Sequence, residues 1–178
     1  MRPRIISVAI LAAVLAMLLG AAKTAFARPQ LHDYLSDEEA NKIRDAATPS
    51  DRIKLYVSFA EDRLAKFDYE LNRTAPERDR SDILNGLLHG YEGAMDDASD
   101  EIDDATRKQA DIKGALKLMD EKSKSFLSRL QKYSKNGRYL SDYSDTLQDA
   151  IDSTTDAISE VAEARKTMLP AVVRRRKQ

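Results

Sequence analysis

Residues 84–133, LNGLLHGYEGAMDDASDEIDDATRKQADIKGALKLMDEKSKSFLSRLQKY, carry the longest hydrophobic pattern in this chain. Alternating steps of four and three residues from Leu84 to Tyr133 meet an apolar or aromatic side chain at thirteen of fifteen positions. Only Gln109 and Ser123 interrupt the pattern, and the stretch contains no proline. Such a heptad pattern predicts long helices that pack side by side. The expected fold class is therefore all-α, an elongated antiparallel helical bundle or coiled coil.

Two arrangements fit this pattern. In the first, which we favour, one long central helix runs from about residue 75 to residue 135. Helix 49–73 would pack on its first half and helix 139–169 on its second. The alternative is an up-down-up-down four-helix bundle with a turn near residues 104–110. We favour the continuous helix because residues 103–111 contain neither Gly nor Pro and because the heptad phase runs through them unchanged.

The N-terminus has the pattern of a secretory signal peptide. Arg2 and Arg4 precede an apolar run at residues 5–20, and Ala25-Phe26-Ala27 fits the small-x-small cleavage rule. The run is shorter than the roughly 20 residues that cross a bilayer. We therefore expect residues 1–27 to be cleaved after Ala27, with only transient membrane contact through this segment. A retained membrane anchor is the alternative. The expected location is the periplasm or cell envelope of a bacterium.

The rest of the chain divides into three parts. Residues 28–48 form a leader and a short helix, which begins with a capping box at Ser36 and Glu39. This helix is expected to bury Ile43 at most. Residues 49–169 form the helical domain, whose first helix has Thr48 as its N-cap and Pro49 in the first turn. Residues 170–178 form a disordered basic tail. Thr74-Ala75-Pro76-Glu77 predicts the start of a third helix. Gly86, Gly90 and Gly93 indicate close approach of another helix, with a kink as the alternative. Asn136-Gly137 predicts a left-handed C-cap.

An acidic cluster in the middle of the long stretch is the first candidate site. Clustered carboxylates bind Ca²⁺ and other hard cations when they converge from several directions. One helix presents them in a row, however, and the chain has no D-x-D-x-D-G loop, so we interpret the cluster as a solvated helix surface and predict no metal site. Weak divalent-cation binding is the alternative. The residues concerned are Asp96, Asp97, Asp100, Glu101, Asp103 and Asp104.

The basic tail is the second candidate. Four adjacent positive charges could contact lipid headgroups, nucleic acid, an acidic partner or the acidic cluster of another copy. A frayed charged terminus is the commoner explanation, and we predict no specific nucleic-acid binding. The residues with a possible electrostatic contact are Arg174, Arg175, Arg176 and Lys177.

No catalytic or cofactor-binding pattern is present in the sequence. The chain has no cysteine, and neither His32 nor His89 follows a Glu by three residues, as a di-iron bundle would require. Haem ligation by His89 with a methionine is a weaker interpretation, because methionines at heptad positions usually fill the core. Zinc-protease, nucleophile-elbow, Walker and dinucleotide motifs are all absent. We therefore expect no enzyme and no cofactor.

The segment Asp51–Leu64, DRIKLYVSFAEDRL, resembles the first helix of exported bacterial helical proteins of unknown function. The likeness covers about residues 51–105. It implies a bacterial envelope setting but no activity, and it transfers no functional residue.

Together these patterns predict an exported, non-enzymatic structural or interaction protein. Its partner is expected to be another protein or a second copy of the chain. A periplasmic chaperone-like or ligand-binding helical module is the alternative, and such a module would expose apolar surface beyond what its helices bury among themselves.

Overall fold

The structure is a computed structural model that describes residues 34–74 and 78–168. Within these ranges there are five α-helices, one short 3-10 helix and no strand, so the all-α bundle is confirmed. The predicted signal peptide, the basic tail at residues 170–178 and most of the Thr74-Ala75-Pro76 signal lie outside the described ranges. The elements are α2 (Asp37–Asp45), α3 (Pro49–Asn72), α4 (Arg80–Arg107), α5 (Lys113–Asn136), η1 (Leu140–Asp142) and α6 (Ser144–Thr167).

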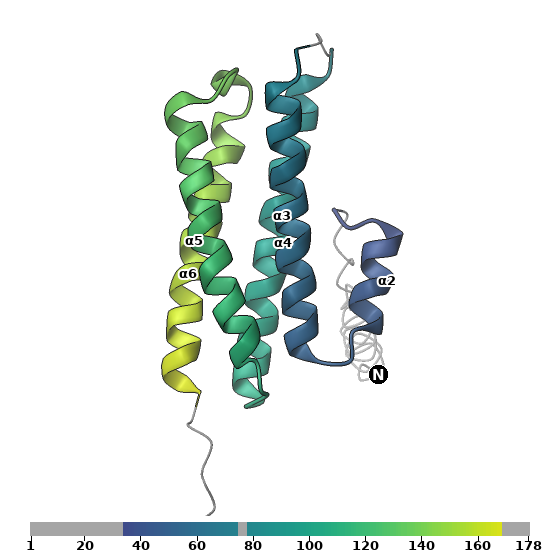
Figure 1. Ribbon diagram of the computed structural model, residues 1–178, viewed down its shortest axis with the longest axis vertical. Coiled ribbons are helices and arrows are strands. Elements are labelled where there is room, and N and C mark those ends of the chain that lie inside the picture. The colour runs from purple at the N-terminus through teal and green to yellow at the C-terminus, as the bar shows by residue number, and fades with distance from the viewer. Residues whose placement is uncertain (1–33, 75–77, 169–178) are drawn as a thin grey trace, which may run out of the picture. The chain divides into compact units, whose positions relative to one another are not determined.

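Helices α3 to α6 run up, down, up and down beside one another (Figure 1). Helix α3 packs against both α4 and α5, and α6 also packs against both of them, which places α4 and α5 on a diagonal of the bundle. The short α2 contacts α3. This is the up-down-up-down topology expected when helices of similar length are joined by short connections.

The prediction of one continuous central helix is wrong. Helix α4 ends at Arg107, and the chain turns back through Gln109, whose φ of 53° is left-handed. The Gln109 amide donates to the Thr106 carbonyl at 3.1 Å, and the Ala110 amide donates to the Ala105 carbonyl at 2.9 Å. This is the hydrogen-bond pair of a left-handed helix C-cap, with Gln in the position usually taken by Gly.

The heptad phase survives the turn for a physical reason. Ala105, the last core position of α4, and Ile112, the residue before α5, are both fully buried at the same end of the bundle. Each side of the turn therefore supplies a core residue at the position that an unbroken helix would use. The turn near residues 104–110, given above as the alternative, is the correct arrangement.

The interior is filled by large side chains from all four long helices. Phe67 on α3 has its ring centroid 5.2 Å from both Tyr133 and Tyr143, and Tyr91 on α4 lies 5.8 Å from Phe126 on α5. Burying each such side chain contributes roughly 1.5–3 kcal/mol. The tyrosine hydroxyls also find partners, because Tyr91 hydrogen-bonds Thr154 Oγ1 at 2.6 Å.

Several local predictions are confirmed. The Ser36 hydroxyl accepts the Glu39 amide at 3.3 Å, and the Glu39 carboxylate accepts the Ser36 amide at 2.9 Å, which completes the capping box. Thr48 caps α3 by accepting the Asp51 amide at 3.1 Å, with Pro49 in the first turn. Helix α3 then ends at Asn72, one residue from the predicted end.

Other local predictions are wrong. Ala40, rather than Ile43, is the buried residue of α2, and Ile43 is only partly buried against the core. Gly137 has an ordinary φ of −67°, and Tyr139 takes the left-handed conformation instead. Helix α4 begins at Arg80, after Asp79, so Thr74 does not cap it.

The three glycines of α4 do not mark close approach of another helix backbone. Gly86 has open space around it, Gly90 lies under the side chain of Arg63, and Gly93 lies under the ring of Tyr34.

Candidate functional site

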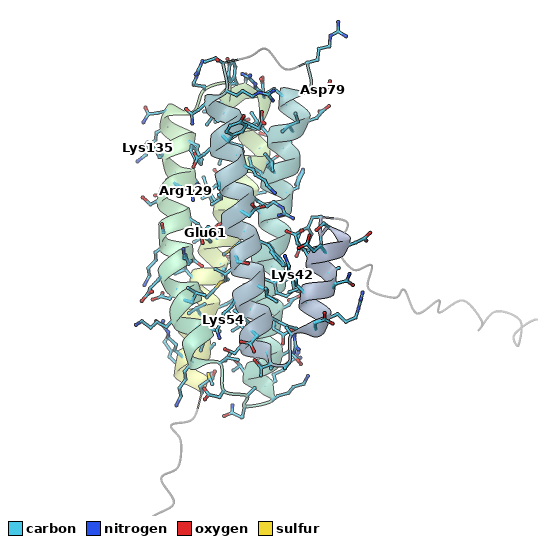
Figure 2. All side chains as sticks on the ribbon, turned by 45° about the vertical axis from the view of Figure 1, so that its right-hand side comes forward. Lys42, Lys54, Glu61, Asp79, Arg129 and Lys135 are labelled. Carbon is cyan, nitrogen blue, oxygen red and sulfur yellow. The ribbon has the colours of Figure 1, made fainter. Side chains whose placement is uncertain are left out.

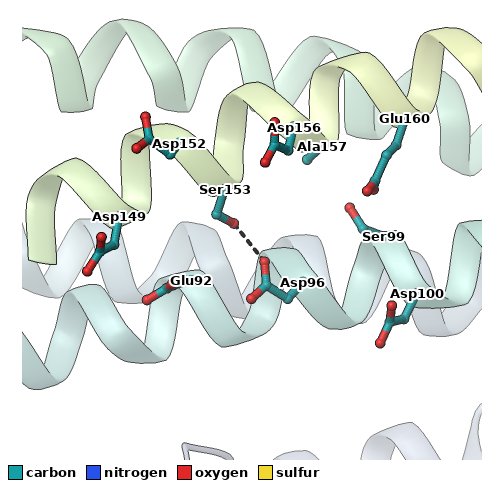
Figure 3. Close-up of a pocket in the computed structure, with 10 residues that line it drawn as sticks. All are labelled: Glu92, Asp96, Ser99, Asp100, Asp149, Asp152, Ser153, Asp156, Ala157 and Glu160. Carbon is teal, nitrogen blue, oxygen red and sulfur yellow. Dashed lines mark hydrogen bonds between the residues drawn. The ribbon is translucent and has the colours of Figure 1, made fainter.

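A groove of about 550 Å³ lies between α4 and α6 and is lined mainly by charged side chains (Figure 3). Among the ten residues that line it, seven are carboxylates and none is Lys or Arg. Ser99 and Ser153 keep the groove open, since their side chains are small, and Ala157 is buried at its α6 wall. We call this surface the acidic groove; its carboxylates are Glu92, Asp96, Asp100, Asp149, Asp152, Asp156 and Glu160.

Helical periodicity builds the acidic groove. Glu92, Asp96 and Asp100 lie four residues apart on α4, which places them on one side of that helix. The carboxylates of α6 recur at three- and four-residue intervals and face them across the groove. Packing of α4 against α6 then brings the two rows together.

The groove lacks an internal counter-charge. Ser153 Oγ donates to Asp96 Oδ1 at 2.8 Å (Figure 3). Glu160 Oε2 is enclosed and accepts no hydrogen bond within the described chain. Neighbouring like charges repel one another, although water and salt screen the repulsion between exposed groups. The arrangement therefore favours any cationic group that approaches it.

The six predicted acidic candidates do not form one site, because the 3.6-residue period turns them in different directions. Asp96 and Asp100 line the acidic groove, and Asp103 lines a smaller cavity of about 340 Å³ that continues beyond Glu160. In the other direction, Asp97 accepts a hydrogen bond from the Tyr34 hydroxyl.

The remaining two candidates are ion-paired. Glu101 lies 2.7 Å from Arg52 of α3, and Asp104 lies 2.5 Å from Lys108. Within residues 34–74 and 78–168, no group of three or more His, Asp or Glu side chains has a geometry that could hold a metal ion.

A second charged surface lies on α5 and was not predicted from the sequence. Helix α5 carries seven basic and two acidic residues, whereas α4 carries eight acidic and two basic ones. Five exposed lysines of α5 recur at intervals of four, seven, eight and three residues, which confines them to about 100° of the helix circumference. We call this surface the basic face; its residues are Lys113, Lys117, Lys124, Lys132 and Lys135.

Two other cations of α5 point away from the basic face and toward α3. Lys122 binds Glu61 at 2.6 Å, and Arg129 binds Asp68 at 2.5 Å. Figure 2 shows Arg129 and Lys135 along α5, with Glu61 on the neighbouring α3. These pairs join α3 to α5, whereas the basic face is turned outward, where Lys117 pairs with Glu121 and Lys124 with Asp120 on α5 itself. Counting charge by helix would have revealed this surface, but only the four tail cations stood out in the sequence.

The histidine candidates give no site. His89 is exposed on α4, with Nδ1 3.6 Å from Glu92, while Met95 and Met119 are fully buried. His32 and the tail residues Arg174, Arg175, Arg176 and Lys177 lie outside the described ranges.

Helices long and apolar enough to cross a bilayer are not found among the described residues. No family model, curated protein or solved structure matches the chain. The likeness of residues 51–105 to exported bacterial proteins is therefore still an expectation.

Proposed function

We propose that the mature chain, residues 28–178, is an exported, non-enzymatic helical module of a bacterial cell envelope that associates with further copies of itself through its charged surfaces. The observation that supports this proposal is the separation of charge on one bundle. The acidic groove lies between α4 and α6, and the basic face lies on the outer side of α5. Complementary patches of this kind steer association and fix its register.

The form of the acidic groove favours a macromolecular partner. It is open to solvent and lined mainly by carboxylates, whereas small-molecule pockets are mostly apolar and enclosed. A row of lysine side chains can place several ammonium groups along such a groove at once. At 1.5 Å per residue, the groove extends about 17 Å along α6, a length that spans the interval from Lys113 to Lys124.

The chaperone-like alternative has less support. An apolar client needs exposed apolar surface, and the large hydrophobic side chains exposed in the described ranges are Tyr69 and Tyr139. Tyr139 is itself covered by cations, since the Arg80 guanidinium carbon lies 4.9 Å from its ring centroid. These two tyrosines do not make a continuous apolar patch of the size that marks such sites.

Pairing of the acidic groove with the basic face joins two different surfaces. Such an interface is heterologous, so successive copies join head to tail into a ring if the rotation closes and into an open filament if it does not. The proposal therefore predicts assemblies that grow with concentration rather than a closed dimer.

Sedimentation velocity of the mature chain at increasing concentration tests this proposal. We expect the weight-average sedimentation coefficient to rise with concentration at low salt and to return to the monomer value near 1 M salt, where the screening length is about 3 Å. The triple variant Lys117→Gln, Lys124→Gln, Lys132→Gln should remain monomeric.

A matched control removes the same charge elsewhere. Lys42, Lys54 and Lys66 are exposed on α2 and α3, so their triple replacement by Gln should leave self-association unchanged. A monomer at every concentration, or equal loss of association in both triple variants, would contradict the proposal. Export is checked separately by intact mass from the native host, which should begin at Arg28; a membrane-bound species beginning at Met1 would contradict it.

A further inference from the structure

Helix α2 is attached to the bundle differently from the other helices. Of its nine residues only Ala40 is buried, whereas α3 buries eight residues and α4 eleven. Leu35 and Ile43 are half-buried against the core. Because apolar burial is the main source of helix attachment, α2 receives far less of it than α3 to α6.

Polar contacts replace the missing apolar ones. The Arg63 guanidinium of α3 binds both carboxylate oxygens of Glu39 at 2.7 Å and also donates to the Tyr34 carbonyl at 3.2 Å. The Arg63 and Glu39 side chains are only 11% and 14% exposed, so this two-pronged pair is shielded from water. Hydrogen bonds from Arg63 lower the pKa of Glu39 to about 2, and the pair therefore stays charged at neutral pH.

The second attachment is the packing of the Tyr34 side chain on α4. Its ring lies on Gly93 of α4, so closely that a Cβ at position 93 would come within 2.6 Å of two ring carbons. The Tyr34 hydroxyl donates to Asp97, which is 7% exposed, one turn further along α4. Burial and this hydrogen bond raise the pKa of Tyr34 far above its usual value, so the hydroxyl remains a donor.

The connection between α2 and α3 is held loosely, with Arg52 Nη1 of α3 donating to the Ala46 carbonyl at 3.4 Å. Residues 46–48 are non-helical, with Ala46 and Thr48 in extended conformations. Thr48 caps α3 with its own side chain, so the start of α3 is complete without α2. A segment with few buried apolar contacts and a hinge at one end opens at a lower free energy than the whole domain.

We propose that residues 34–45 form a displaceable arm, which opens as a unit from α3 and α4 while the bundle α3–α6 stays folded, and that Arg63 is the group that holds it closed. Opening exposes Arg63, Asp97 and the Gly93 surface together. The arm thus covers a surface that consists of the Arg63 guanidinium, the Asp97 carboxylate and the surface at Gly93 on which the Tyr34 ring packs.

Hydrogen exchange of the mature chain, measured by mass spectrometry on peptides from each helix, tests the arm. In the unaltered protein, α2 amides should exchange at least about tenfold faster than the slowest amides of α4 and α6, because only local opening is needed. Arg63→Gln should accelerate exchange in α2 by about tenfold more, and α2 should still exchange well before the slowest amides of α4 and α6. Global unfolding, through which those amides exchange, starts from the same destabilised closed state and accelerates by no more than that factor.

The matched control is Arg129→Gln, which removes another interhelical ion pair, between α5 and Asp68 of α3. It should not change exchange in α2. Equal exchange rates in α2 and the core helices, or unchanged exchange in α2 after Arg63→Gln, would overturn the proposal.

A second variant keeps the test decisive if Arg63→Gln does not fold. Gly93→Ala leaves the ion pair intact but displaces the Tyr34 ring, while Ala favours the helical conformation of α4. We expect faster exchange in α2 together with unchanged or slower exchange in α4. Unchanged exchange in α2 would show that the packing of Tyr34 on Gly93 does not hold the arm.

Discussion

Gln109 offers a test in which the sign of the effect identifies the topology. In the four-helix bundle, Gln109 adopts a left-handed φ of 53°, which costs an L-residue about 1–2 kcal/mol. Glycine adopts this conformation without that cost. Gln109→Gly should therefore remove the strain at the end of α4.

Two effects reduce the stabilisation expected from Gln109→Gly. The substitution removes the hydrogen bond that the Gln109 side-chain Nε2 donates to the Thr106 carbonyl at 3.0 Å, an exposed bond of roughly 0.5 kcal/mol. Glycine also gives the unfolded chain more freedom, at a cost of about 0.5 kcal/mol. The expected net effect is a stabilisation of about 0.5 kcal/mol, or one to two degrees in the melting temperature of a domain of this size.

Urea unfolding followed by far-UV circular dichroism measures this change. Ser125, exposed in the middle of α5, supplies the matched control, because Ser125→Gly should destabilise by about 0.5 kcal/mol. If Gln109 lay inside a continuous helix, Gln109→Gly would instead lower the free energy of unfolding by up to about 1 kcal/mol. A loss of that size, similar to or larger than the control, would refute the left-handed turn.

Three further predictions follow from the structure. Spin labels at the exposed positions Asp82 and Lys132 should lie within about 25 Å of each other, given interhelical distances near 10 Å, whereas a continuous helix would separate them by about 75 Å. Because folding lowers the pKa of Glu39 from 4.5 to about 2, its stabilisation is complete above pH 4.5 and is lost as the pH falls toward 2; acid unfolding of Glu39→Gln should lack this component. Asp96→Asn with Asp100→Asn should leave the free energy of unfolding within about 1 kcal/mol or raise it, since repulsion is relieved; a large loss seen only when divalent cations stabilise the parent would favour metal binding.

The sequence predicts the helices well where local chemistry is unambiguous. The cap at Ser36 and the start of α3 at Thr48 and Pro49 follow from short-range hydrogen bonding, and both are present. The hairpin was missed because a left-handed cap was expected to need Gly. Gln109 bears that cost instead, and the complete burial of Ile112 next to the turn offsets it.

The two polar interruptions of the heptad pattern have different meanings. Gln109 marks the turn, whereas Ser123 is fully buried in α5 with no hydrogen-bond partner for its Oγ within the described residues. A polar residue at a core position therefore does not distinguish a turn from a tolerated core serine. The similar lengths of the four helical segments were the better indicator of the topology.

The candidate site could be predicted only in part. Asp96 and Asp100 were identified from the sequence, but their partners Asp152 and Asp156 lie on α6, and only tertiary pairing brings them together. The sequence also suggested one acidic cluster where helical geometry distributes the carboxylates to three directions. Charge counted along a chain shows which helices are acidic, but it does not show which faces meet.

Cysteine crosslinking between copies tests the central claim most directly, since the chain has no cysteine of its own. Ser153 lies in the acidic groove, and Ser128 lies exposed on α5 among the lysines of the basic face. Mixing Ser153→Cys with Ser128→Cys under mild oxidation at low salt should give mainly the mixed disulfide dimer, and near 1 M salt should suppress it. Ser58→Cys, exposed on α3, is the control partner for Ser153→Cys. A mixed dimer no more abundant than the Ser153–Ser58 product, or one unaffected by salt, would contradict association through the charged faces.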